Sequence, residues 1–162
     1  MPIKPVISNN SPLVALWRLD LLSLLRDLYT EVWIPQEVKR EFLRIEKISR
    51  QEALNNAAWI KTIDLTDSES IPISNRLDPG EASVLALGKK YDARFVIIDE
   101  KKARQEARKM GLSLKGTVGV LLDAKKNGLI DEIKPLLIAL KRNGMHLNES
   151  IIFEALQQAG EM

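Results

Sequence analysis

The stretch that decides the fold begins with Leu77-Asp78-Pro79-Gly80-Glu81-Ala82 and leads through a helical segment to Phe95-Val96-Ile97-Ile98-Asp99-Glu100. Asp78 can cap a helix, and Pro79 suits the first helical position because its φ angle is already helical. The later apolar run predicts a buried strand that ends in two acids. In open α/β sheets, sites lie beyond the carboxyl ends of the strands. We therefore expect Glu81 and Asp99 to converge on a functional site.

Strands alternate with helices along the rest of the chain. Short apolar runs predict strands at 6–7, 31–34 and 112–114, and a weakly alternating segment at 59–63 predicts an edge strand. The polar segment 66–76 predicts a loop, and amphipathic helices are expected at about 131–142 and from about 148 onward. This order favours a three-layer α/β/α domain with a central, mostly parallel sheet. We interpret residues 1–162 as a single domain whose last two helices, about 131–159, form a C-terminal extension.

Composition excludes several kinds of site. There is no cysteine, which excludes disulfides, thiolate metal sites and cysteine catalysis. The single histidine, His146, excludes multi-histidine zinc sites, and we expect it at the surface or at a helix cap. A formal net charge of +2 is too small to argue for nucleic-acid binding by itself. No apolar run reaches transmembrane length and the first residues lack the form of a signal peptide, so we expect a cytoplasmic protein.

Five segments, in order along nearly the whole chain, carry a resemblance to one family. They are Val6–Leu13, Ile34–Phe42, Leu77–Ala82, Ile98–Arg104 and Gly116–Leu121. Together these segments resemble the PIN domain, a fold of Mg²⁺- or Mn²⁺-dependent ribonucleases, and within it the VapC-like toxins of toxin–antitoxin pairs. The resemblance implies a PIN-like α/β domain with RNA as a partner, and it allows an antitoxin protein or a second copy of the chain as further partners.

The resemblance also implies which residues form the site. Glu41, Glu81 and Asp99 match the catalytic acids of the family, and Asn9, Glu81, Asp99 and Glu100 match positions that hold the cation. Relatives usually carry aspartate where this chain has Asn9, whose amide oxygen can still bind a cation but brings no charge. Carboxylate and amide oxygens suit Mg²⁺, which keeps several waters and needs only a few protein ligands. The cation would activate the phosphodiester for hydrolysis.

The helix after Asp99 is basic. Residues 100–110 carry five basic and two acidic side chains, and three of the basic ones recur at i, i+3 and i+7. Such a stripe could hold an RNA backbone, or it could be a solvated face on which Lys102 pairs with Glu106. We take the stripe, with two hydroxyl residues near the acids, as the candidate RNA contacts: Ser11, Lys101, Arg104, Arg108 and Thr117.

Each candidate residue also has a purely structural interpretation. Glu81 can complete an Asp-x-x-Glu capping box, and Asp99 can cap the helix from Glu100. Glu41 can be a solvated helix charge, and Asn9 a turn or cap residue. Ser11 is expected to cap a helix that starts at Pro12.

Three functions therefore stay open. The first is a metal-dependent endoribonuclease, acting as the toxin of a toxin–antitoxin pair. The second is a nucleic-acid-binding or regulatory PIN-like protein that Asn9 has weakened as a catalyst. The third is a protein-interaction module that dimerises through apolar helices, which requires an exposed apolar patch.

Overall fold

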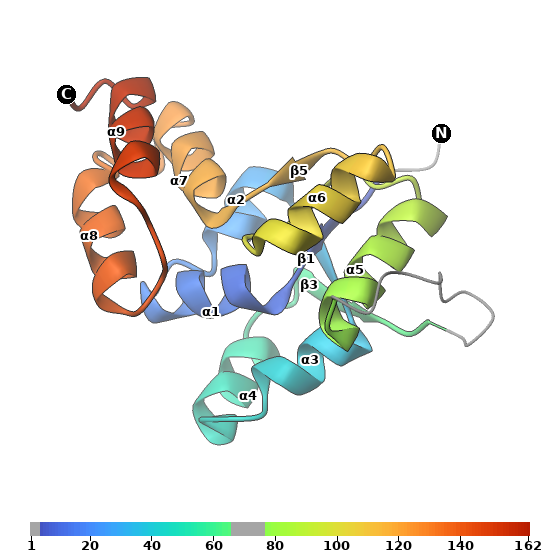
Figure 1. Cartoon of the computed structure of the whole chain (residues 1–162). Helices are drawn as coiled ribbons and strands as arrows, with labels where there is room; N and C mark the ends of the chain where they lie inside the picture. The colour runs from blue at the N-terminus through green and yellow to red at the C-terminus, as the bar shows by residue number, and fades with distance from the viewer. Residues whose placement is uncertain (1–3, 66–76) are drawn as a thin grey trace.

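Five short strands form one parallel sheet in the part of the chain that the computed structural model describes, residues 4–65 and 77–162 (Figure 1). In chain order they are β1 (Val6–Ser8), β2 (Val32–Pro35), β3 (Ile60–Ile63), β4 (Phe95–Ile97) and β5 (Leu114–Lys115). Their order in the sheet is β3-β2-β1-β4-β5, and Ser8 of β1 is in register with Ile97 of β4. Because every pairing is parallel, all of these strands end at the same edge of the sheet.

Helices connect the strands and cover the sheet. They are α1 (Asn10–Arg18) and α2 (Leu24–Tyr29) after β1, α3 (Gln36–Phe42) and α4 (Lys47–Asn55) after β2, α5 (Pro79–Lys90) before β4, α6 (Lys101–Lys109) after β4, and α7 (Thr117–Lys126), α8 (Lys134–Arg142) and α9 (Glu149–Gln158) after β5. Figure 1 shows α5 and α6 on the near side of the sheet and α2 on the far side. The expected α/β fold is therefore confirmed, with β3 at an edge. The loop expected at 66–76 lies outside the described residues.

The core lies on both faces of the two central strands. Ile7, Val96 and Ile97 have no exposed surface, which explains why β1 and β4 are continuous apolar runs rather than alternating ones. Leu137 of α8 and Leu156 of α9 belong to the same buried cluster as these strands. The last helices thus pack on the core that supports the rest of the fold. No helix in the described ranges combines the length and the apolar character needed to cross a membrane.

Two helices begin elsewhere than the local sequence indicates. The first helix starts at Asn10 with Asn9 as its N-cap residue, so Ser11 is not the cap. Pro12 then occupies the third helical position, where the missing N–H costs no intrahelical hydrogen bond. The prediction of a start at Pro12 was wrong because proline fits anywhere in the first turn.

The eighth helix starts at Lys134 rather than near residue 131. The backbone N–H groups of Ile133 and Lys134 donate to the carboxylate of Glu161 at 2.7 and 3.0 Å, and Lys125 Nζ lies 2.9 Å from the same group. Although desolvation acts in the opposite direction, these contacts lower the pKa of Glu161. A residue near the far end of the chain therefore sets where this helix begins.

Candidate active site

The expected site residues gather at the edge where the parallel strands end. Asn9 follows β1 and Asp99 follows β4, and the Asn9 N–H donates to the Ile97 carbonyl at 3.0 Å. These neighbouring strands are also where the order of the sheet reverses, the usual place for a site in an open α/β sheet. The helix after β2 brings Glu41 to this edge, and the antiparallel return of α5 places Glu81 there at its first turn.

Asp99 is held by Thr117 at the start of α7. Its Oδ1 accepts from the Thr117 N–H at 2.8 Å and its Oδ2 accepts from Thr117 Oγ1 at 2.6 Å. Burial raises the pKa of Asp99, while the two hydrogen bonds from Thr117 and the charge of Arg104 oppose the increase. The carboxylate is thus fixed in orientation. Asp99 does not cap α6, because Glu100 is the N-cap and accepts from the Lys102 N–H at 3.4 Å.

Glu81 completes a capping box, as the sequence indicates. Its backbone N–H donates to Asp78 Oδ1 at 2.8 Å, and its Oε1 accepts from the Asp78 N–H at 3.1 Å. Only 7% of Glu81 is exposed, and this burial raises the pKa of its carboxyl group. The Asp78 N–H opposes the increase, whereas the charges of Asp78 and Glu100 add to it. A structural role for Glu81 therefore coexists with a position inside an acidic cluster.

Glu41 extends that cluster across the start of α5. Its carboxylate lies so close to Gly80 that a β-carbon at this position would overlap Glu41 Oε1. Burial raises the pKa of Glu41 most strongly, and the charges of Asp78 and Glu81 raise it further, while Arg44 opposes them. The acids thus form an arc that runs from Glu41 through Asp78 and Glu81 to Glu100.

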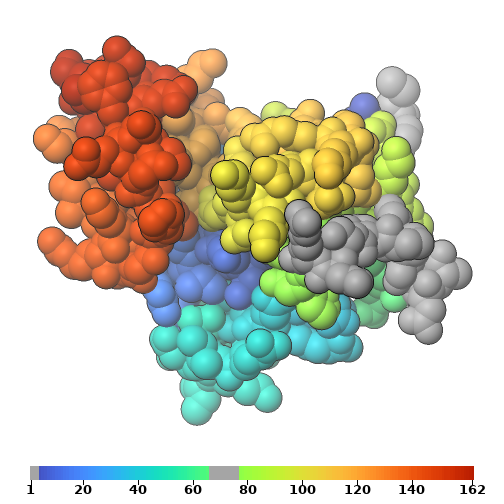
Figure 2. Space-filling view, in the orientation of Figure 1, coloured from blue at the N-terminus to red at the C-terminus, as the bar shows by residue number. Residues whose placement is uncertain are grey.

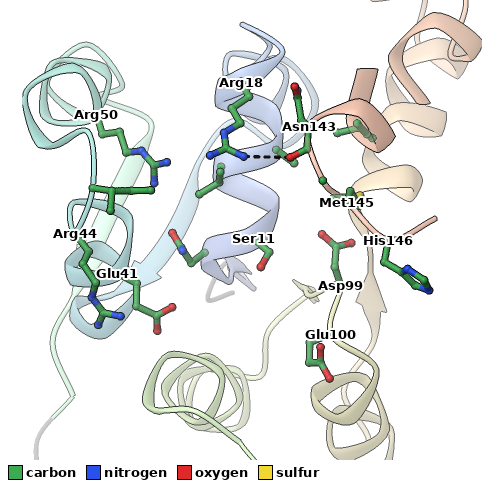
Figure 3. A pocket seen from close by; sticks show the side chains of 16 residues that line it. Ser11, Arg18, Glu41, Arg44, Arg50, Asp99, Glu100, Asn143, Met145 and His146 are labelled. Atoms are coloured by element: carbon green, nitrogen blue, oxygen red, sulfur yellow. Dashed lines mark hydrogen bonds between the residues drawn. The ribbon is translucent and has the colours of Figure 1, made fainter. Parts of the chain in front are cut away.

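A cleft of about 550 Å³ is lined by Glu41, Asp99 and Glu100. Figure 2 shows the hollow, with α1 (blue) between α8 and α9 (orange and red) on one side and α3 and α4 (cyan) on the other. Glu41 reaches it from one wall, and Asp99 and Glu100 reach it from the opposite wall, with Ser11 of α1 between them (Figure 3).

The basic lining of this cleft is not predicted by the sequence. Arg18 of α1, Arg44 in the turn between α3 and α4, and Arg50 of α4 line it, although no motif singles them out, because only the packing of these elements brings the three together. His146 also lines the cleft, and it is exposed, as expected.

The donor set suits a hydrated cation rather than a fully enclosed one. Within residues 4–65 and 77–162, no three His, Asp or Glu side chains lie close enough together to hold a metal ion. Asn9 is 4% exposed, however, and its buried Oδ1 has no hydrogen-bond partner. An oxygen left unpaired in this way, at the end of the strand adjacent to the one that Asp99 follows, fits Mg²⁺ or Mn²⁺ that keeps most of its waters. Asn9, Glu81, Asp99 and Glu100 are the residues that would hold it.

The basic helix α6 only partly presents the expected stripe. Lys101 and Arg108 are exposed, but Arg104 turns toward the sheet and donates from Nη1 to the Ile98 carbonyl at 2.7 Å. Burial lowers the pKa of Arg104, the charge of Arg108 lowers it further, and the charge of Asp99 opposes both. Arg104 therefore faces the interior of the protein near Asp99 and is not part of a solvent-facing stripe. On the same helix Glu106 pairs with Lys109 at 3.5 Å, rather than with Lys102 as the solvated-face alternative has it.

We predict that Gly80→Ala disturbs Glu41 through direct overlap. In most exposed helix positions this substitution stabilises a protein by up to about 1 kcal/mol, because alanine is the better helix former. Here the new methyl group would displace the Glu41 carboxylate, so the gain should disappear in the wild type and return in a Glu41→Ala background. Chemical denaturation of the two single variants and the double variant measures this coupling.

Gly119→Ala is the matched control for this cycle. Gly119 also lies in the first turn of a helix, and a β-carbon there would meet only the Lys115 side chain at an ordinary 3.6 Å. Gly119→Ala should stabilise the protein equally in the wild type and in the Glu41→Ala background. Additive effects of Gly80→Ala and Glu41→Ala would contradict the close approach of Glu41 to α5.

We also predict that Glu41→Gln raises the melting temperature at pH 7 but not at pH 4. A carboxyl group whose pKa is raised on folding stabilises the folded state below its unfolded pKa, and this contribution is lost as pH rises through the folded pKa. The Glu41 pKa is raised from 4.5, so the wild type should lose stability between about pH 4 and pH 7, whereas glutamine has no charge to gain. Thermal melts across this range measure the difference. Glu52→Gln, at an exposed position of α4 outside the acidic cluster, is the control and should leave the melting temperature unchanged at both pH values.

A match to one protein family agrees with this geometry. A comparison with curated proteins found no match. The family DUF3368, described as a PIN domain, matches residues 5–161, which include every strand and helix described above. A match over nearly the whole length, together with the parallel sheet and the acids at its carboxyl edge, assigns the family. The chain therefore belongs to the PIN-domain family DUF3368.

Proposed function

We propose that this protein is a metal-dependent ribonuclease that hydrolyses phosphodiester bonds of RNA in the cleft between α1, α3 and the end of β4. Membership of the PIN-domain family supports nuclease chemistry. The observation that carries the proposal is that burial raises the pKa values of Glu41, Glu81 and Asp99 at one edge of the sheet, where the side-chain oxygen of Asn9 is also buried without a partner. A divalent cation compensates such a group of acids, and perturbed carboxyl groups in a cleft are typical of active sites.

Phosphodiester hydrolysis requires only a few roles from the side chains of the cleft. In the hydrolysis, a water oxygen bonds to phosphorus while the bond to the leaving oxygen breaks, and the leaving oxygen takes up a proton. A bound Mg²⁺ or Mn²⁺ would supply polarisation of the phosphate and a water of lowered pKa. Asp99 and Asn9 would hold that ion at the ends of the central strands, and Thr117 keeps Asp99 oriented. Glu41, on the opposite wall with a raised pKa, would accept the proton of the attacking water.

The first test is Asp99→Asn, which should lower ribonuclease activity at least about a hundredfold, as expected when a group that stabilises developing charge is removed. Asparagine retains an oxygen for the Thr117 N–H and an amide donor for Thr117 Oγ1, so the fold should be preserved. Cleavage of a labelled single-stranded RNA in Mn²⁺ gives the activity, and a thermal melt verifies folding.

Asp92→Asn is the matched control, because Asp92 lies at an exposed turn with a φ of 50° that asparagine tolerates. It should leave activity unchanged. A folded and fully active Asp99→Asn would remove Asp99 from the mechanism. If expression of the wild type stops growth and Asp99→Asn does not, the proposal extends to the toxin role that the likeness to VapC proteins implies.

The second test restores the charge that relatives carry at the first acidic position. Asn9→Asp should bind Mn²⁺ more tightly than the wild type and cleave RNA faster. Without metal it should melt at a lower temperature, because another carboxylate joins a crowded group. With Mn²⁺ this loss should shrink, because a ligand that binds the native state stabilises it. Thermal melts of both proteins, with and without Mn²⁺, measure the effect.

Asn148→Asp is the control, since Asn148 caps α9 through its side-chain oxygen and aspartate caps equally well. Its melting temperature should not respond to Mn²⁺ more than that of the wild type. The same lack of response in Asn9→Asp would place Asn9 outside the metal site. The alternative of a nucleic-acid-binding or regulatory PIN-domain protein would then be favoured.

A further inference from the structure

Arg50 is a buried cation whose hydrogen bonds are incomplete. It is 2% exposed, and its guanidinium lies 4.8 Å from the ring centre of Trp17 and 5.2 Å from that of Phe42. Nη1 donates to the Phe42 carbonyl at 3.0 Å, but Nε and Nη2 are buried with no hydrogen-bond partner. The nearest acid, Glu46, is half exposed and 3.6 Å from Nη2. Burying a charge in this way is costly unless an anion completes its contacts.

Arg50 is one of the residues that line the cleft beside the acids. Arg18 of α1 lines the same cleft, where its Nη1 donates to the Asn143 carbonyl at 3.3 Å. Figure 3 shows Arg50 on one wall and Arg18 on the central helix α1 at this end of the cleft, while Glu100 lies at the other end. Two guanidinium groups that share a cavity repel each other, so this end of the cleft favours a negatively charged ligand.

The geometry of Arg50 matches a phosphate. Nε and Nη2 form one edge of the planar guanidinium, and this edge can donate two parallel hydrogen bonds to two oxygens of one phosphate group. Its contacts with Trp17 and Phe42 already fix the plane, so little side-chain entropy would be lost on binding.

We infer that Arg18 and Arg50 form a second phosphate site, which holds a backbone phosphate of RNA beside the one that faces the acids. The inference rests on the proposed function in taking RNA as the ligand. It deepens that function by adding an anchor on α1 and α4, separate from the basic helix α6. The RNA strand would run along the cleft from Arg18 and Arg50 toward Asp99.

The experiment measures binding of a labelled single-stranded oligoribonucleotide in EDTA, so that neither cleavage nor the cation contributes. Arg50→Met and Arg18→Gln should each bind about tenfold more weakly than the wild type, the loss expected for a hydrogen bond to a charged group. The slope of log affinity against log salt should become shallower by about 0.7 for each phosphate contact removed from a single strand.

Arg26→Gln is the matched control. Arg26 also lies over a tryptophan, 5.0 Å from the ring centre of Trp59, and it pairs with Asp27 outside the cleft. Arg26→Gln removes the same charge and the same kind of ring contact, so the RNA affinity and the salt slope of this variant should equal those of the wild type. Unchanged binding in both cleft variants, or an equal loss in Arg26→Gln, would overturn the inference.

A stability measurement tests the site without RNA. Inorganic phosphate should raise the melting temperature of the wild type above that in chloride of equal ionic strength, and Arg50→Met should lose this rise. Methionine can fill the space between Trp17 and Phe42, so we expect this variant to fold. If it does not fold, RNA binding by Arg18→Gln decides. Tighter binding of polyglutamate than of RNA would overturn the inference in favour of an acidic protein segment.

The inference and the proposed function fail in distinguishable ways. If the wild type cleaves no RNA in Mg²⁺ or Mn²⁺ but its metal-free binding depends on Arg18 and Arg50, the phosphate site stands and the ribonuclease proposal falls. If cleavage depends on Asp99 while metal-free binding is indifferent to both arginines, the ribonuclease proposal stands and the second phosphate site falls.

Discussion

The parallel pairing of β1 with β4 is the constraint on which the rest of the structure depends. It places Asn9 and Asp99 at the ends of adjacent strands and joins them through the hydrogen bond from Asn9 N–H to the Ile97 carbonyl. Because both strands are buried on both faces, their register cannot slip without exposing apolar side chains. The same pairing marks the point where the strand order reverses, so helices leave it in opposite directions and open a cleft between them.

The acids approach the helix starts closely because glycine stands there. Glu41 lies against Gly80 at the start of α5, and a β-carbon on Gly116 would come within 2.9 Å of Asp99 Oδ1 and 3.2 Å of Arg104 Nη1. The N-terminal ends of helices favour negative charge, which offsets part of the repulsion among the acids. Burial nevertheless raises the pKa values of Glu41, Glu81 and Asp99, so the cluster is more costly when charged than solvated acids would be.

The cleft carries opposite charges at its two ends. Asp99 and Glu100 lie at one end, and Arg18 and Arg50 lie toward the other, so a hydrated cation and an anionic strand could be held side by side. This division arises from packing, because Trp17 and Phe42 enclose Arg50 while Thr117 holds Asp99. The stripe expected on α6 contributes less than its sequence indicates, since Arg104 is committed to the Ile98 carbonyl.

The sequence by itself determined the alternation of strands and helices, the parallel sheet and the capping box at Asp78 and Glu81, because these follow from apolar periodicity and short-range hydrogen bonding. It also placed Asp99 at the carboxyl end of a buried strand. Only the tertiary structure decided that Asp99 bonds to Thr117 instead of capping α6, that Glu161 sets the start of α8, and that Arg50 points into the cleft. Each of these contacts joins residues on different elements, so no local pattern records it. The energy that selects them comes from burial, which depends on how the helices pack.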